Sequence, residues 1–240
     1  MQIIAFATTK VRGGKYFRDE MYRFAVCREK LGDTVDCIEI EHKKAKDIWW
    51  IVQTKLSGVQ TDCIAIFAHG WWHRIGGAGV NIYDCSTLAD RIMQTGARKV
   101  ILYSCSCGRG KFEWPYGNQV KEYRGAGKVK PRDGVALRLG DELAIDGYPS
   151  QIVAHTCFGD TTRNPYACRV SSLGFNGVVR TPVVARVKEN QYPKGAGRWA
   201  RWRKALKETD LKYNFPFMGD VEIIDHLDKG DTNDKLYTGA

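Results

Sequence analysis

Two apolar segments each end on a side chain that can take part in nucleophilic chemistry. Residues 64–68 run directly into His69 and Gly70, and residues 100–104 run directly into Cys105. If the two segments are neighbouring parallel strands, their carboxyl ends share one edge of a sheet. An imidazole and a thiol would then face each other, which is the minimum set for a cysteine nucleophile assisted by a base.

The pattern of apolar residues predicts the elements that must position this pair. Strand-like segments lie at 2–8, 35–40, 62–68, 99–105 and 151–155, and helix-like segments at 15–31, 45–57, 86–95 and 134–146. This alternation predicts an α/β fold, a three-layer sandwich with a mostly parallel central sheet. A further strand at 177–188 contains Pro182, which favours an edge position because proline cannot donate a ladder hydrogen bond.

The chain of 240 residues is long enough for one large domain with an extension. We expect an α/β domain over residues 1–190, with a basic, glycine-rich insertion at 108–133. Residues 191–240 are expected to form a C-terminal extension that contains a basic helix at 197–208. No apolar run is long enough to cross a bilayer, and the first residues read as a strand rather than a signal peptide, so we expect a cytoplasmic protein.

The chain carries a formal net charge of +10. The excess is concentrated in two clusters, Arg109, Lys111, Lys121, Arg124, Lys128, Lys130 and Arg132, and Lys194, Arg198, Arg201, Arg203, Lys204 and Lys207. Such clusters are compatible with nucleic acid or an acidic protein as partners, although a solvated basic surface is the slightly better explanation of them.

The eight cysteines do not suggest a disulfide framework. Cys37 and Cys63 lie within apolar strand-like runs and Cys27 on a helix-like face, as reduced, buried cysteines do. Cys105 and Cys107 form a close pair, but their spacing is not that of a CxxC redox motif.

The two motifs together resemble the caspase-like cysteine peptidases, a group that includes caspases, metacaspases, gingipains, legumains, separases and the CHAT proteases. Residues 64–70 match the strand that ends in His-Gly. Residues 103–108, Tyr-Ser-Cys-Ser-Cys-Gly, are similar to the metacaspase nucleophile segment Asp-Ser-Cys-His-Ser-Gly. Residues 152–156 resemble the next strand of the caspase sheet, so the likeness in topology extends over roughly residues 1–160.

The resemblance implies an endopeptidase without a cofactor, acting on a protein or peptide substrate. It makes Cys105 the nucleophile, with Cys107 as the rival, and His69 the general acid that protonates the leaving amine. It also implies an oxyanion hole formed by the backbone N–H groups of Gly70 and Cys105.

Residues around the pair would then contact substrate. Trp71 would form a substrate wall beside the site, unless the segment 71–73 is simply a β-hairpin packed over the sheet. Ser104, Cys157 and Asp160 complete the candidate substrate-binding set; other acidic candidates for a pocket are Asp84, Asp141 and Asp146.

Tyr103 stands where metacaspases have an acidic residue, and the glutamine of the caspase motif is missing. These two positions therefore do not support cleavage after Arg, Lys or Asp.

Two other functions fit the same residues. The first is a zinc site, because imidazole and thiolate groups are zinc ligands; its candidates are His69, His73, Cys85, Cys105, Cys107 and Cys157. The second is a non-catalytic α/β binding module that uses its basic surfaces to hold nucleic acid or an acidic protein.

Overall fold

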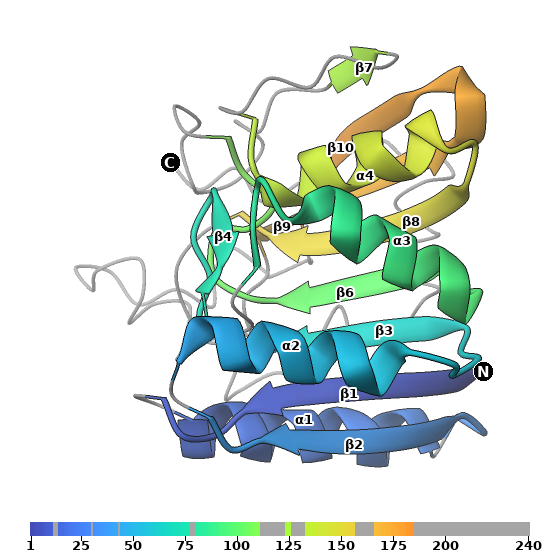
Figure 1. Cartoon of the computed structure of the whole chain (residues 1–240). Helices are drawn as coiled ribbons and strands as arrows, with labels where there is room; N and C mark the ends of the chain where they lie inside the picture. Colours follow the sequence, from blue (N-terminus) through green and yellow to red (C-terminus); the bar gives the residue numbers. More distant parts are fainter. Residues whose placement is uncertain are drawn as a thin grey trace, which may run out of the picture.

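The computed structural model describes residues 1–11, 14–29, 31–42, 44–76, 80–110, 123–125, 133–156 and 166–184 (Figure 1). Within these residues eight strands form one sheet and two short strands form a separate hairpin. The strands of the large sheet are β1 (Gln2–Thr8), β2 (Thr34–Ile40), β3 (Cys63–Phe67), β6 (Lys99–Tyr103), β7 (Tyr123–Gly125), β8 (Pro149–His155), β9 (Tyr166–Leu173) and β10 (Val178–Val184). The hairpin consists of β4 (Arg74–Ile75) and β5 (Val80–Asn81).

Four α-helices and one short 3-10 helix lie in the described part of the chain. They are α1 (Gly14–Glu29), α2 (Ala45–Leu56), α3 (Cys85–Thr95), α4 (Val135–Ile145) and η3 (Gly174–Asn176). The order of strands in the sheet is β2-β1-β3-β6-β8-β9-β10-β7. The first five are mutually parallel, and antiparallel pairing begins at β9. The predicted α/β fold with a mostly parallel central sheet is confirmed.

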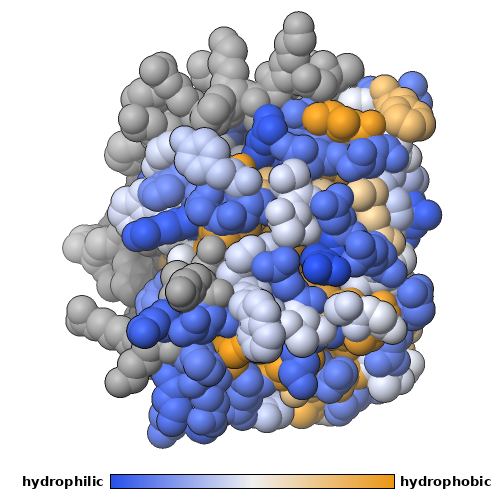
Figure 2. Space-filling view, viewed as in Figure 1, coloured by the Kyte–Doolittle hydropathy of each residue, from blue (hydrophilic) through white to orange (hydrophobic). Residues whose placement is uncertain are grey.

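The helices cover both faces of the sheet, as a three-layer sandwich requires. Side chains from alternate positions of β3 enter different cores: Ile64 and Ile66 pack with α2, α3 and α4, whereas Ala65 and Phe67 pack with α1. All five residues of β3 are buried, which explains why its sequence is apolar without alternation. The outward sides of α2, α3 and α4 are mainly hydrophilic, with hydrophobic side chains recessed between them (Figure 2).

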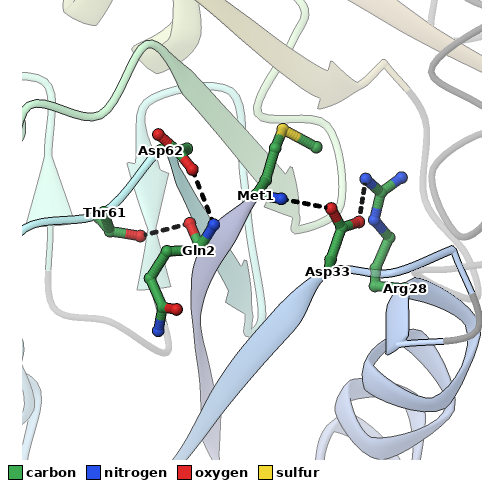
Figure 3. A network of polar contacts seen from close by, with 6 residues as sticks. All are labelled: Met1, Gln2, Arg28, Asp33, Thr61 and Asp62. Carbon is green, nitrogen blue, oxygen red and sulfur yellow. Dashed lines mark hydrogen bonds and ion pairs between the residues drawn. The ribbon is translucent and has the colours of Figure 1, made fainter.

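Polar contacts fix the amino-terminal end of β1 to the segments that precede β2 and β3 (Figure 3). The amino group of Met1 lies 2.7 Å from Asp33 Oδ1, and Asp33 also forms an ion pair with Arg28. The backbone N–H of Gln2 donates to Asp62 Oδ2 at 2.7 Å, and the Thr61 hydroxyl donates to the Gln2 carbonyl at 2.8 Å. These contacts hold the register of the central strands at the edge opposite to their carboxyl ends.

Several element boundaries differ from the sequence prediction. β6 ends at Tyr103, so Ser104 and Cys105 begin a turn rather than end the strand. α1 ends at Glu29, and Leu31 lies beyond it with 56% of its surface exposed. The apolar pattern predicts neither β9 nor β7; β7 lies inside the predicted insertion at 108–133 and pairs with β10.

Other predictions fall wholly or mainly on residues outside the described ranges. These include the side chain of Cys27, most of the insertion, and the extension 191–240 with its basic helix. Among the described residues, no helix is both long and apolar enough to cross a membrane.

Candidate active site

The pairing of β3 with β6 places His69 and Cys105 at matching positions. The two strands are adjacent and parallel, and Phe67 pairs with Tyr103 at their carboxyl ends. His69 and Cys105 each follow two residues later. The ring of His69 contacts Phe17, so His69 lies on the face of the sheet that α1 covers. The predicted meeting of two strand ends is therefore present in the fold.

Gly70 shows how closely the two strand ends approach each other. A β-carbon on Gly70 would lie 2.6 Å from the Cys105 carbonyl oxygen, 2.6 Å from Cys107 Sγ and 2.7 Å from Ser104 Cβ. Such separations are far below van der Waals contact, so only a residue without a side chain fits. The backbone next to His69 thus touches the turn that carries Cys105.

The turn that follows β6 is held by several elements at once. The Gly108 N–H donates to the His155 carbonyl of β8 at 2.8 Å, and the Cys168 thiol of β9 contacts the Gly108 carbonyl at 2.9 Å. The Ala136 N–H, in the first turn of α4, donates to the Cys107 carbonyl at 3.1 Å. Strands β8 and β9 and helix α4 therefore fix the turn.

Ser106 adopts a left-handed backbone conformation with φ of 59°. It is the only non-glycine residue with positive φ among the residues described. L-amino acids adopt this conformation at a cost, and such strain is found where the surrounding structure requires a sharp turn. Here it turns the chain between Cys105, which is half-buried, and Cys107, which is fully buried.

Burial distinguishes the two candidate nucleophiles. Burial raises the pKa of the Cys107 thiol far above its usual range, and the neighbouring Cys105 raises that pKa further. The Cys107 thiol also lies 3.5 Å from the Arg74 carbonyl, to which it donates. Because the thiolate is the reactive species, these surroundings make Cys107 a poor nucleophile. The half-buried Cys105 is the better candidate.

His69 is exposed on one side and packed against α1 on the other. Its imidazole makes a T-shaped contact with the ring of Phe17, with centroids 4.8 Å apart and planes at 89°. Phe17 is only 4% exposed and belongs to the core between α1 and the sheet. Phe17 is not among the candidates predicted from the sequence, although its spacing to Met21 and Phe24 marks the same helix face.

The segment after Gly70 is a β-hairpin, the simpler of the two interpretations of residues 71–73. Trp71 pairs with Arg74 through a bond from the Trp71 N–H to the Arg74 carbonyl at 2.8 Å, and β4 and β5 continue the hairpin. The Trp71 side chain nonetheless remains 41% exposed beside His69. The ring of His73 makes a tilted contact with that of Trp72, and burial, together with Arg74, lowers the pKa of His73.

The remaining candidate residues divide by position. Ser104 is buried, and its Cβ faces Gly70. Asp84 occupies the N-cap position of α3, but its carboxylate accepts the Asn81 N–H at 3.0 Å rather than an N–H of the helix, and Asp141 is buried in α4 near Arg138. Asp146 follows the end of α4 that lies away from the turn. Cys157 and Asp160 lie outside the described residues.

Two further observations concern the chemistry of this edge. In the described ranges, the Gly70 N–H makes no backbone hydrogen bond. In the same part of the chain, no three His, Cys, Asp or Glu side chains lie close enough together to hold a metal ion. The geometry does not support the zinc alternative among these residues.

Tyr103, the residue two positions before Cys105, is buried completely. Its ring stacks on Phe67 with centroids 4.3 Å apart and also lies 6.0 Å from the ring of His155. The position beneath Cys105 is therefore filled by aromatic rings.

A comparison with protein-family models gave no match to the chain, and a search of curated proteins gave no relative.

Proposed function

We propose that this chain is a cysteine endopeptidase in which Cys105 is the nucleophile and His69 the general acid and base. The Cys105 thiolate attacks the carbonyl carbon of a peptide bond, and the Gly70 N–H donates a hydrogen bond to the developing oxyanion. His69 gives a proton to the leaving amine, and a thioester with Cys105 remains. Water, deprotonated by His69, then hydrolyses the thioester and restores the thiol.

One observation carries the proposal: the neighbouring parallel strands β3 and β6 end at the paired residues Phe67 and Tyr103, and His69 and Cys105 each follow two residues later. The contact of Gly70 with the turn after β6 supports it, because it limits how far the two strand ends can separate. Burial of Cys107 supports the choice of Cys105, since a buried thiol with a raised pKa reacts slowly.

The first test is the rate at which each cysteine reacts with iodoacetamide near neutral pH, followed by mass spectrometry of the peptides. Cys105 is expected to react fastest, and His69→Ala is expected to slow that reaction by about tenfold or more. His42→Ala is the matched control, because His42 is an exposed histidine that follows another parallel strand, β2. That variant should label at the rate of the unmodified protein.

The second test is cleavage of reduced, denatured casein, with Cys105→Ser as the inactive comparison. Fragments that appear with the unmodified chain and not with Cys105→Ser or His69→Ala support the proposal. Equal alkylation rates for Cys105 and the other cysteines, together with intact casein, would contradict it.

The binding-module alternative stays a prediction. Of the two basic clusters, Arg109 alone has a side chain within the described part of the structure.

A further inference from the structure

We propose that Phe17 is a positioning residue that keeps the His69 imidazole turned toward Cys105. This inference rests on the proposed function, because it assigns the orientation of the same imidazole to a residue of α1. The observation behind it is the T-shaped contact between the two rings, with centroids 4.8 Å apart.

The location of α1 in the fold indicates the side from which Phe17 contacts His69. α1 packs against β1, β2 and β3, whereas Cys105 follows β6, the neighbour of β3 on its other side (Figure 1). The Phe17 ring contacts His69 from the α1 side, and the proposal requires this to be the side away from Cys105. A histidine side chain has three staggered χ1 wells, and a ring packed against the imidazole would exclude the well that points into that ring.

The start of α1 is held firmly enough to keep the Phe17 ring in place. The Gly14 N–H donates to the Val11 carbonyl at 2.9 Å, and a β-carbon on Gly14 would collide with the Thr9 carbonyl. The first turn of α1 therefore lies directly against the chain that leaves β1. Phe17 follows one turn later and is almost completely buried, so its ring has little freedom to move.

The experiment compares three substitutions in α1. Phe17→Leu keeps an apolar side chain in the core and removes the ring, whereas Phe17→Tyr keeps the ring. Phe24→Leu is the control, because Phe24 packs against Phe67 and Tyr103 in the same core, and its ring contacts are with those two residues. The measurements are the rate of Cys105 alkylation in the folded protein and the NMR shifts of the imidazole C–H groups.

Phe17→Leu is expected to slow the alkylation of Cys105 by about three- to tenfold, the effect of one T-shaped ring contact. Phe17→Tyr should restore most of the rate, and Phe24→Leu should leave it unchanged. In the unmodified protein, the His69 imidazole resonances should be displaced by the Phe17 ring relative to those of the exposed His42. Phe17→Leu should remove that displacement.

The outcomes separate this inference from the proposed function. If His69→Ala slows alkylation and Phe17→Leu does not, Phe17 is a packing residue only and the inference is overturned. If His69→Ala has no effect either, the proposed function fails and the inference fails with it. Should Phe17→Leu not fold, undisplaced His69 resonances in the unmodified protein would overturn the inference, and displaced resonances together with a normal rate in Phe17→Tyr would support it.

Discussion

The Cα of Gly70 faces the sulfur of Cys107 so closely that a β-carbon on Gly70 would lie 2.6 Å from Cys107 Sγ. The same carbon would meet the Cys105 carbonyl oxygen at 2.6 Å. Gly70 does not have a positive φ, so crowding, and not backbone conformation, requires glycine there. The separation of the two strand ends therefore depends on the size of this one residue.

Gly70→Ala is expected to destabilise the fold by about 1–3 kcal/mol, because the added methyl group pushes the hairpin away from the turn after β6. Alkylation of Cys105 should slow at the same time, since His69 is the residue directly before Gly70 and its backbone would shift with that of Gly70. Gly76→Ala, in the same hairpin, is the matched control: its β-carbon would find its nearest neighbours at 3.7 Å, an ordinary contact. Urea denaturation should show a change within about 0.5 kcal/mol for that variant. Equal stability of the two variants would contradict the close approach.

Cys63 gives a prediction about how the stability of the folded chain depends on pH. This prediction does not involve the candidate active site. Burial raises the pKa of the Cys63 thiol to about 12 in the folded chain, whereas an unfolded cysteine titrates near about 8.5. The raised pKa means that the folded state holds the proton more tightly. Its contribution to stability is therefore complete below about pH 8.5 and is lost as pH rises toward 12.

Cys63→Ser removes this titration because a hydroxyl does not ionise in that range. Between pH 7 and pH 10, the unmodified chain should lose about 2 kcal/mol more unfolding free energy than Cys63→Ser. Urea denaturation at the two pH values measures the difference. Parallel losses in both proteins would show that Cys63 is not buried as the structure describes.

The parallel half of the fold could be predicted because its strands are buried on both sides. β3 and β6 are continuous apolar runs, and the general rule that parallel strands align their carboxyl ends then brings His69 and Cys105 together. The antiparallel half is harder to predict. β9 alternates Cys168 and Val170 with Arg169 and Ser171, and the buried Arg169 makes the segment read as polar. Its period of two is the signal that could have revealed it.

The details of the site depend on contacts that no local pattern carries. Ser106 adopts the left-handed conformation that glycine favours, and the turn at this residue leads into the fully buried Cys107. Similarly, the contact of Phe17 with His69 joins a helix to a strand end more than fifty residues away in sequence. Spacing alone could place Phe17 on the inner face of α1, but could not show which residue it touches.

Asp33 and Asp19 allow a comparison between a buried and an exposed ion pair on the two ends of α1. The pair of Arg28 with Asp33 has side chains only 7% and 8% exposed, whereas that of Arg18 with Asp19 is 40% and 46% exposed. Asp33→Ala leaves Arg28 buried without this partner and is expected to cost about 3–5 kcal/mol in urea denaturation. Asp19→Ala should change stability by no more than about 0.5 kcal/mol. Similar effects of the two substitutions would contradict the burial of the Arg28 pair.

The burial of Tyr103 predicts that an acidic pocket cannot be restored by one substitution. Tyr103→Glu places a carboxylate where Phe67, Phe24 and His155 surround a fully buried ring. The lost packing and the buried charge should together cost about 3–5 kcal/mol, and no cleavage after Arg or Lys should appear. Tyr103→Phe keeps the stacked ring and should cost about 1 kcal/mol.

Tyr83→Glu is the control for the Tyr103 series, because Tyr83 is 81% exposed and its replacement leaves the core intact. Thermal or urea denaturation of Tyr103→Glu, Tyr103→Phe and Tyr83→Glu ranks the effects. If Tyr103→Glu proves as stable as Tyr83→Glu, the carboxylate must reach solvent, which would mean that the stack beneath Cys105 opens. The position two residues before the proposed nucleophile would then be free to contact substrate, and burial of the Tyr103 ring would no longer explain why that position lacks an acidic residue.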